Sequence, residues 1–291
     1  MSSTVYGQKM GLATTKRTLT RAAAAILLFV TLFVFMFPFF WMISTSLKSF
    51  GETRMFPPPL LPEVARFDNY TRAFQSAPLL RYGLNSLVIC LSVIVLICGL
   101  TSMAAYALAY LNFRGKRFVF LALMSPQMVA GVTLMLPLFE VLRRAGVLNT
   151  LAALIIPYTV LYSPFSIFLL RGYLQSIPKD LVEAARVDGA SEFWILTRVI
   201  IPLLRPALGT VAIFAFIWSW NEFLFAMVFI QNPPLRTVSV GLALLQAVPN
   251  FPPETNLIFA AATAITLPVL ILFSTMQKQF IEGMTAGAVK F

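Results

Sequence analysis

Six long stretches of this chain contain almost no charge, and each is long enough to cross a lipid bilayer. A membrane-spanning helix needs about 20 largely apolar residues. The six stretches cover residues 22–47, 82–113, 118–139, 145–170, 207–230 and 255–277. Several of them contain proline, which breaks helices in soluble proteins but is tolerated in helices that cross membranes. The pattern predicts an all-α membrane protein with six transmembrane helices.

The composition excludes a water-exposed surface over most of the chain. Of its 291 residues, 59% are apolar and only 11% are charged, whereas soluble domains carry roughly a quarter charged residues. The net charge of +11 does not indicate nucleic-acid binding, because the basic residues are scattered between apolar stretches. Histidine is absent, which removes the usual general base and the commonest metal ligand. We therefore expect no metal site and no cofactor bound by this chain itself.

The basic residues also predict which ends of the chain face the cytoplasm. Six spans place both termini on one side of the bilayer, and 14 of the 22 lysines and arginines fall on that side. Cytoplasmic segments are enriched in basic residues, so both termini are expected in the cytoplasm. The chain then divides into an N-terminal tail (1–21), one six-helix domain (22–277) and a C-terminal tail (278–291). A cleaved signal peptide is the alternative for the first stretch, which exceeds the usual apolar length of about 7–15 residues.

The longest predicted cytoplasmic loop, residues 171–206, contains the strongest functional signal. Pro178 suits the start of a short helix, and Gly189 can adopt the left-handed conformation that ends it. Ser191, followed by an apolar run, suits the start of a second helix. Together the two helices would form a small knob with an alanine-rich face around Ala184, which a partner protein can approach closely. A solvated connector is the alternative interpretation.

The residues of this loop resemble the EAA loop of permeases from binding-protein-dependent ATP-binding-cassette (ABC) importers. The family pattern is Glu-Ala-Ala, three residues, glycine and, further on, Ile-x-Leu-Pro. Gly189 sits at the expected offset, and Val199-Ile200-Ile201-Pro202 stands for the last part, with Ile201 in place of leucine. The resemblance assigns coupling to an ATPase to six residues: Glu183, Ala184, Ala185, Asp188, Gly189 and Ala190.

Other segments resemble the carbohydrate branch of the same family, and the tail is similar to that of MalG-type permeases. These segments include Asn85-Ser86-Leu87, Leu148-Asn149-Thr150, Trp220-Asn221-Glu222-Phe223 and the tail from Glu282 to Lys290. The resemblance implies a MetI-like fold that pairs with a second, homologous permease. It also implies two ATPase subunits, which bind ATP and Mg, and an extracytoplasmic solute-binding protein.

Four residues of the fifth stretch form a candidate solute path. Trp218 and Trp220 offer flat faces that suit sugar rings, while Asn221 and Glu222 can bind hydroxyl groups. On one continuous helix Trp218 and Glu222 share a face, and Glu222 is the only acid within the six stretches. Acids inside a membrane are functional candidates. The alternatives are an ion pair between Glu222 and the second permease, and a membrane-interface role for the tryptophans.

The loop between the last two spans is a candidate contact for the binding protein. In the maltose member of the family, the corresponding loop reaches into the binding protein. Residues 231–256 of this chain are rich in proline and asparagine. We assign the contact to Gln231, Asn232, Pro249 and Asn250.

The resulting hypothesis is a permease subunit of a sugar importer in the plasma membrane of a bacterium or archaeon. An importer of amino acids, polyamines or osmolytes is the nearest alternative. A membrane-embedded enzyme would need a catalytic constellation, and an ion-coupled carrier usually has repeats and broken helices; the sequence displays neither. It also lacks the G-x-x-x-x-G-K-[ST] loop that binds nucleotide phosphates, so the ATPase must be another chain.

Overall fold

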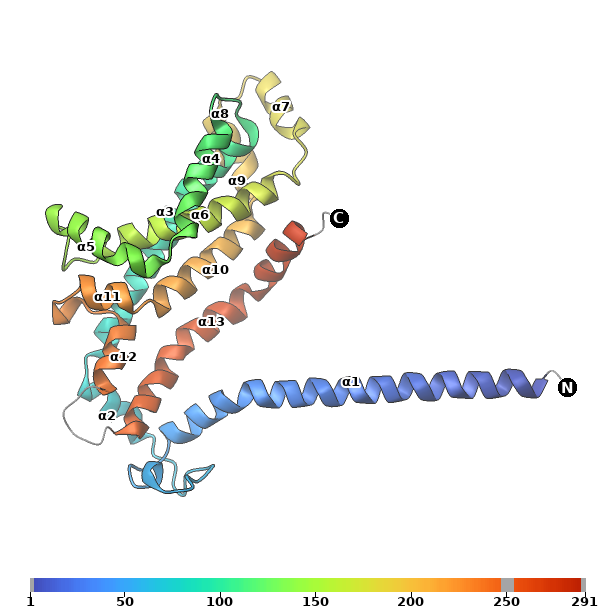
Figure 1. Cartoon of the computed structure of the whole chain (residues 1–291), viewed down its shortest axis with the longest axis vertical. Coiled ribbons are helices and arrows are strands. Elements are labelled where there is room, and N and C mark those ends of the chain that lie inside the picture. The colour runs from blue at the N-terminus through green and yellow to red at the C-terminus, as the bar shows by residue number, and fades with distance from the viewer. Residues whose placement is uncertain (1–2, 247–253, 289–291) are drawn as a thin grey trace. The chain divides into compact units, whose positions relative to one another are not determined.

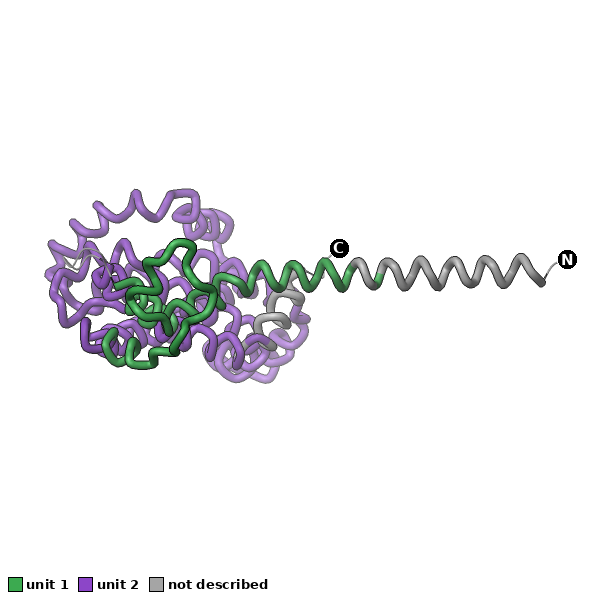
Figure 2. The backbone as a smooth tube through the Cα atoms, turned by 90° about the horizontal axis from the view of Figure 1, so that it is seen from below, with its two compact units in different colours: residues 1–73, 254–263 green, residues 74–253, 264–291 purple. Residues whose placement is uncertain are grey.

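The computed structural model describes residues 3–246 and 254–288, which fall into two compact units (Figure 2). Unit 1 comprises Met1–Ala73 and Glu254–Thr263, and unit 2 comprises Phe74–Pro253 and Ala264–Phe291. Within the described residues, every regular element is helical (Figure 1). The α-helices are α1 (Ser3–Ser46), α2 (Asp68–Ser76), α3 (Leu79–Tyr110), α4 (Lys116–Met124), α5 (Met135–Arg144), α6 (Ala152–Leu174), α7 (Asp180–Val187), α8 (Glu192–Trp194), α9 (Ile201–Leu203), α10 (Arg205–Asn221), α11 (Leu224–Phe229), α12 (Val238–Gln246) and α13 (Thr255–Ala288).

Shorter helical turns connect several of these helices. They are η1 (Glu52–Arg54), η2 (Ser125–Met128), η3 (Gly131–Leu134) and η5 (Pro233–Leu235), together with a π-helical turn, η4 (Ile195–Ile200). Such turns mark places where the regular helical hydrogen bonding is interrupted. Most of them lie beside the bends that are described next.

Four of the described helices are long and apolar enough to cross a membrane. They contain Ala24–Ser46, Leu79–Tyr110, Ala152–Leu174 and Thr255–Thr275. Two further pairs of helices pass that test only together. Lys116–Met128 and Gly131–Arg144 meet at a bend of 98°, and Glu192–Leu203 and Arg205–Asn221 meet at a bend of 79°. Counting each bent pair as one span gives up to six spans. The predicted fold class is confirmed, with two of the spans broken.

The prediction of one continuous helix over residues 118–139 was wrong. The chain leaves α4 through η2 and η3 and continues as α5, at an angle of 98° to its first half. Pro126 lies in η2, and proline interrupts a helix because it lacks the backbone N–H and clashes with the preceding turn. Membrane-spanning helices often tolerate proline, so the presence of Pro126 alone did not reveal the break.

The prediction of one continuous helix over residues 207–230 was also wrong. Helix α10 ends at Asn221, Glu222 has an extended backbone (φ −66°, ψ 130°), and α11 begins at Leu224. Helix α1 already begins at Ser3 and α13 continues to Ala288, so no helix end marks the tail borders at 21 and 277.

Helices α3, α6 and α10 pack against one another and form the core of unit 2. Small side chains such as Ala153, Ala207 and Ala215 are fully or almost fully buried in this core. Because lipid tails are as apolar as leucine, helices in membranes associate through close packing, which small residues permit. This core supports the elements that carry the candidate site.

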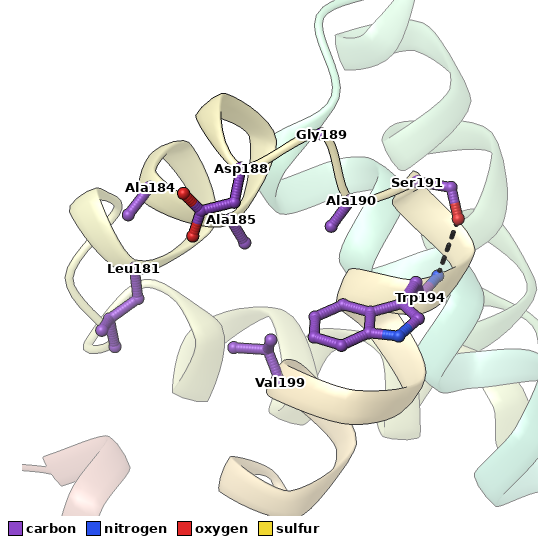
Figure 3. A pocket seen from close by; sticks show the side chains of 9 residues that line it. All are labelled: Leu181, Ala184, Ala185, Asp188, Gly189, Ala190, Ser191, Trp194 and Val199. Atoms are coloured by element: carbon purple, nitrogen blue, oxygen red, sulfur yellow. Dashed lines mark hydrogen bonds between the residues drawn. The ribbon is translucent and has the colours of Figure 1, made fainter.

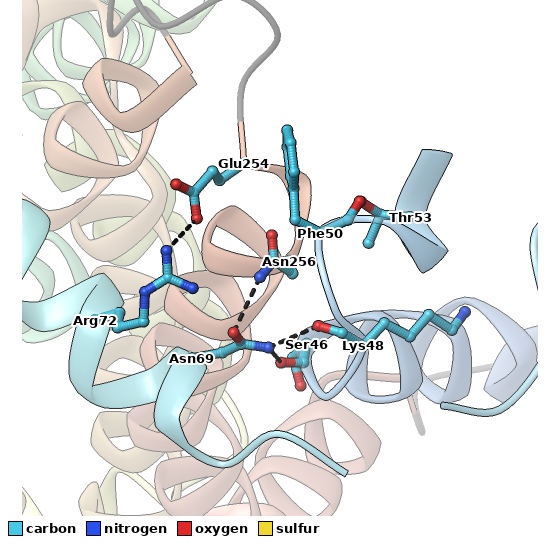
Figure 4. Close-up of polar contacts among 8 residues, drawn as sticks. All are labelled: Ser46, Lys48, Phe50, Thr53, Asn69, Arg72, Glu254 and Asn256. Carbon is cyan, nitrogen blue, oxygen red and sulfur yellow. Dashed lines mark hydrogen bonds and ion pairs between the residues drawn. The ribbon is translucent and has the colours of Figure 1, made fainter. Parts of the chain in front are cut away.

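In unit 1, a buried asparagine joins three segments of the chain (Figure 4). The side-chain amide of Asn69 on α2 donates hydrogen bonds to the backbone oxygens of Ser46 (2.9 Å) and Lys48 (2.8 Å) at the end of α1. Its own oxygen accepts a hydrogen bond from the amide of Asn256 (3.0 Å) at the start of α13. Buried polar groups need such partners, so Asn69 fixes how these three segments meet.

Candidate functional site

The turn of the predicted cytoplasmic knob has the backbone conformation that the sequence predicts. Gly189 has a φ of +81°, in the left-handed region where residues with a side chain are strained. The N–H of Gly189 donates to the oxygen of Arg186, and the N–H of Ala190 donates to the oxygen of Ala185, both at 3.0 Å. This pair of hydrogen bonds is the Schellman motif, which satisfies the last carbonyl groups of a helix. Gly189 therefore ends α7 and turns the chain toward α8.

The start of α8 also follows the predicted pattern. Ser191 is extended, and its hydroxyl oxygen accepts a hydrogen bond from the N–H of Trp194 at 3.3 Å. This side chain replaces the helical partner that the first N–H groups of a helix lack. Helix α7, the Gly189 turn and α8, residues 180–194, are hereafter called the coupling knob.

The coupling knob borders an open hollow with a volume of about 690 Å³ (Figure 3). Large apolar side chains are exposed there: Leu181 keeps 47% and Trp194 keeps 50% of its surface accessible. Exposed apolar surface of this kind commonly marks a contact with another molecule. The residues that line the hollow are Leu181, Ala184, Ala185, Asp188, Gly189, Ala190, Ser191, Trp194 and Val199.

Five of the six predicted coupling residues line this hollow, and Glu183 is the exception. Glu183 borders a smaller hollow of about 100 Å³, together with Lys179, Arg186 and residues from the end of α3 and just after it. The helix turns Glu183 away from the alanine face because neighbouring residues point about 100° apart. The coupling knob thus has one small-residue face and one charged face.

A charged contact joins α7 to α8 within the coupling knob, and a tyrosine hydroxyl and a buried valine attach the knob to the rest of unit 2. The guanidinium of Arg186 donates to both carboxyl oxygens of Glu192, at 2.7 and 3.2 Å. The hydroxyl of Tyr106 on α3 also donates to Glu192, and Val182 is buried in the core of unit 2. The position of α7 is therefore set by α3 and α8 as well as by its own turn.

The four candidate residues of the solute path face different surroundings. Trp220 is buried, and its ring stacks on Phe216 at a centroid distance of 5.3 Å. The half-buried Trp218 packs against other aromatic rings, including Tyr162 at 5.0 Å. Asn221 is exposed, and its amide donates to the backbone oxygen of Ile217 at 2.8 Å.

Glu222 occupies the break between α10 and α11. Its carboxyl group accepts hydrogen bonds from the N–H groups of Phe225 (2.8 Å) and Ala226 (3.0 Å), and from the hydroxyl of Tyr158 on α6. The shared helical face with Trp218 that the sequence suggested is absent at this break, because Glu222 does not continue α10. The described contacts of this acid are thus with the protein's own backbone and a buried tyrosine.

Two of the four predicted contact residues for a binding protein follow α11 and its cap residue Ile230. The N–H groups of Gln231 and Asn232 donate to the side-chain oxygen of Asn149, at 2.6 and 3.1 Å. The other two, Pro249 and Asn250, lie outside the described residues. The described residues contain no group of three or more His, Cys, Asp or Glu side chains that could hold a metal ion.

Asn149, Tyr158 and the contact of Glu192 with Arg186 and Tyr106 were not predicted as parts of the site. Asn149 lies in a segment that resembles the sugar-permease family, and its backbone has a positive φ of 59°. Asparagine tolerates that conformation better than most residues, but one sequence does not indicate which asparagines adopt it. The partners are distant in the chain, so local patterns could not pair them.

The family of the chain follows from comparison with known proteins. Residues 98–285, well over half of the chain, match the family described as binding-protein-dependent transport system inner membrane component. The chain belongs to this family. It is a multi-pass permease subunit of an ABC importer, and it is not an enzyme.

Individual relatives extend the similarity over most of the chain. The sulfoquinovosyl glycerol transport system permease protein SmoH of Agrobacterium fabrum is 38% identical over 88% of this chain and 89% of its own length. The trehalose/maltose transport system permease protein MalG of Thermococcus litoralis is 37% identical, covering 88% and 91%. A chain from the crystal structure of a bacterial ABC transporter involved in the import of the acidic polysaccharide alginate superposes with a TM-score of 0.80. That chain is 26% identical, with 91% of this chain and 98% of the other covered.

Proposed function

We propose that this permease imports a sugar or sugar derivative as one of two homologous permease subunits. The relatives described above are named for sulfoquinovosyl glycerol and for trehalose and maltose, and another, 35% identical, is named for trehalose. A shared carbohydrate class among several relatives favours a sugar over an amino acid, polyamine or osmolyte. Which sugar is carried depends on the binding protein and on both permeases.

The coupling knob is the part of the chain that we assign to the ATPase subunits. Leu181 and Trp194 are exposed beside its hollow. Removing such apolar side chains from water is favourable, so this surface suits contact with a protein partner. Two ATPase subunits would bind ATP and Mg and close on the bound ATP. Because Val182 and Glu192 attach the knob to the helical core, such a closure would move the core with it.

The proposed topology places both termini and the coupling knob in the cytoplasm and the 231–256 loop outside. The supporting observation is the excess of lysine and arginine in the segments assigned to the cytoplasm, which follows the positive-inside rule. On this topology Gln231, Asn232, Pro249 and Asn250 lie on the side where a solute-binding protein docks. One transmembrane permease domain then covers residues 22–277.

The solute path is proposed to pass beside the break between α10 and α11. Irregular backbone is tolerated at membrane depth only where it is buried in protein or lines a cavity. Of the four candidates, the exposed Asn221 is the best placed to meet a sugar hydroxyl. Trp218, Trp220 and Glu222 would act mainly by shaping this part of the chain.

The experiment is reconstitution of the purified chain in liposomes, alone and together with its second permease, two ATPase subunits and binding protein. The chain alone is expected to hydrolyse no ATP and to transport nothing. The complete assembly should take up at least one sugar from a panel of radiolabelled trehalose, maltose and melibiose, and only with ATP. Uptake by the single chain would contradict the importer assignment, and ATP-driven uptake of amino acids or polyamines alone would contradict the sugar assignment.

A further inference from the structure

Helix α11 is too short to stabilise itself in an apolar environment. It has six residues, Leu224–Phe229, whereas the first four N–H groups and the last four oxygens of any helix lack helical partners. Where such a segment lies at membrane depth, water is not available to satisfy these groups. Other parts of the chain must therefore supply the missing hydrogen bonds.

Glu222 supplies them at the start of α11. Its carboxyl oxygens accept from the N–H groups of Phe225 and Ala226, while the hydroxyl of Tyr158 fixes the carboxyl group from α6. The backbone oxygen of Glu222 accepts in addition from the hydroxyl of Ser239 on α12, at 2.6 Å. One residue thus connects the α10–α11 break to two other helices.

Asn149 performs the corresponding function at the end of α11. Its own N–H donates to the backbone oxygen of Phe229 at 3.1 Å. Its side-chain oxygen accepts from the N–H groups of Gln231 and Asn232, the first residues after the helix and its cap. A positive φ of 59° lets the backbone and the side chain of Asn149 face the same segment.

The fixed helix forms part of the boundary of a cavity. A hollow of about 230 Å³ is lined by Phe223, Met227, Ile230, Gln231, Arg236, Val240, Ala243 and Leu244. The first four of these belong to α11 and its flanking residues, and the others belong to α12 and the residues just before it. A shift of α11 would therefore change the shape of this cavity and the start of the 231–256 loop.

We propose that Asn149 and Glu222 are positioning residues that hold α11 at both ends, and that transport requires α11 to be held. Glu222 then acts through the backbone of α11 rather than by binding the solute. This role rests on the proposed function and concerns one residue of the Leu148-Asn149-Thr150 segment and one residue of the Trp220-Asn221-Glu222 segment. Asn149 and Glu222 would hold α11 in place whichever solute the transporter carries.

Three substitutions at Asn149 separate the side-chain hydrogen bonds from the backbone conformation. Asn149→Asp keeps both the oxygen acceptors and the tolerance for positive φ, while Asn149→Gly keeps only the tolerance. Asn149→Ala keeps neither. Amide hydrogen exchange at Gln231 and Asn232 is measured for the unmodified transporter and for each variant, assembled in nanodiscs. Recovery of the complex and its basal ATP hydrolysis are the controls for folding.

Exchange at these two amides should rise about three- to tenfold in Asn149→Gly, in line with the loss of a helix-capping side chain. The exchange rate should rise further in Asn149→Ala, and in Asn149→Asp it should stay close to that of the unmodified protein. Uptake of a panel sugar that the unmodified complex carries should fall in Asn149→Gly and return in Asn149→Asp, with basal ATP hydrolysis unchanged.

Two results would overturn the inference. Unchanged exchange in Asn149→Gly would mean that the side chain does not hold α11, and increased exchange with full uptake would mean that transport does not need α11 to be held. If the unmodified complex carries no sugar at all, the proposed substrate class fails. The exchange data then still decide whether Asn149 holds the helix.

Discussion

The coupling knob and the α10–α11 break are both irregular, yet they are held in opposite ways. In the knob the hydrogen bonds that shape the turn join residues close in the chain: Ser191 and Trp194 are three apart, and Arg186 and Glu192 are six apart. One remote hydrogen bond, from Tyr106 to Glu192, attaches the knob to α3. At the break the side-chain partners outside α11 and its flanks are remote: Tyr158 and Glu222 are 64 positions apart, and Asn149 and Gln231 are 82 positions apart. The knob can therefore form its shape locally and present it to a partner, whereas the break depends on the surrounding helices.

The difference in burial fits this contrast. Around the knob, Leu181, Phe193 and Trp194 are exposed. Large exposed apolar side chains often mark a surface that another molecule covers. At the break, Phe225, Ala226 and Phe229 are buried in the core of unit 2. We infer that the knob is a contact surface and that the break is an internal support.

The largest expected effect is that of Gly189→Ile in the knob. A β-branched residue at a φ of +81° costs roughly 1–3 kcal/mol, and the strain would misdirect α7. Uptake by the assembled transporter should fall by at least about tenfold, while the chain still reaches the membrane. The measurement is uptake and recovery of the ATPase subunits at matched expression.

Gly189→Asn is the matched control, because asparagine tolerates a positive φ. No heavy atom lies within 4 Å of a Cβ built at position 189, apart from the chain neighbours, so the Cβ that both variants add has room. Asparagine should thus retain most of the activity. Equal uptake by the isoleucine and asparagine variants would mean that the turn conformation does not matter for coupling.

A smaller effect is expected from Tyr158→Phe at the break. Tyr158 is only 1% exposed, and the substitution removes the hydroxyl that donates to Glu222. Loss of a buried hydrogen bond to a carboxyl group costs about 1–3 kcal/mol, which should lower the melting temperature of the purified complex by a few degrees. Tyr162→Phe is the control, because the described contacts of Tyr162 with Tyr158 and Trp218 are made by its ring. If the two variants melt alike, the Tyr158–Glu222 contact does not stabilise the break.

The smallest effect is expected from Glu192→Gln, which weakens the contact with Arg186. The side chain of Arg186 is 36% exposed and that of Glu192 is 45% exposed. Exposed ion pairs contribute only about 0.2–1 kcal/mol to stability. Amide hydrogen exchange in α7 should therefore rise by no more than about fivefold. Arg186→Gln and the double variant complete the comparison, since residues that act as a pair give non-additive effects. Additive effects would show that Arg186 and Glu192 act separately.

The sequence predicted the knob well because its rules are local. Gly189 at the end of α7, Ser191 at the start of α8 and the alanine face all follow from residue type and spacing. The helix breaks within residues 118–139 and 207–230 were not predicted, because hydropathy measures length and polarity but not continuity. Tyr158 holds the carboxyl group of Glu222 at the start of α11, and Asn149 holds the residues after its end. Both partners lie on distant parts of the chain, and no local pattern indicates such partners.

Site-specific photo-crosslinking tests most directly that the knob contacts the ATPase. A photoreactive amino acid is placed at Ala184, on the alanine face of the knob, or at Asn232, after α11, in the assembled and ATP-hydrolysing transporter. We expect position 184 to capture the ATPase subunit, and position 232 to capture the solute-binding protein and not the ATPase. Capture of the ATPase at 232, or its absence at 184 in an active complex, would contradict the proposed coupling.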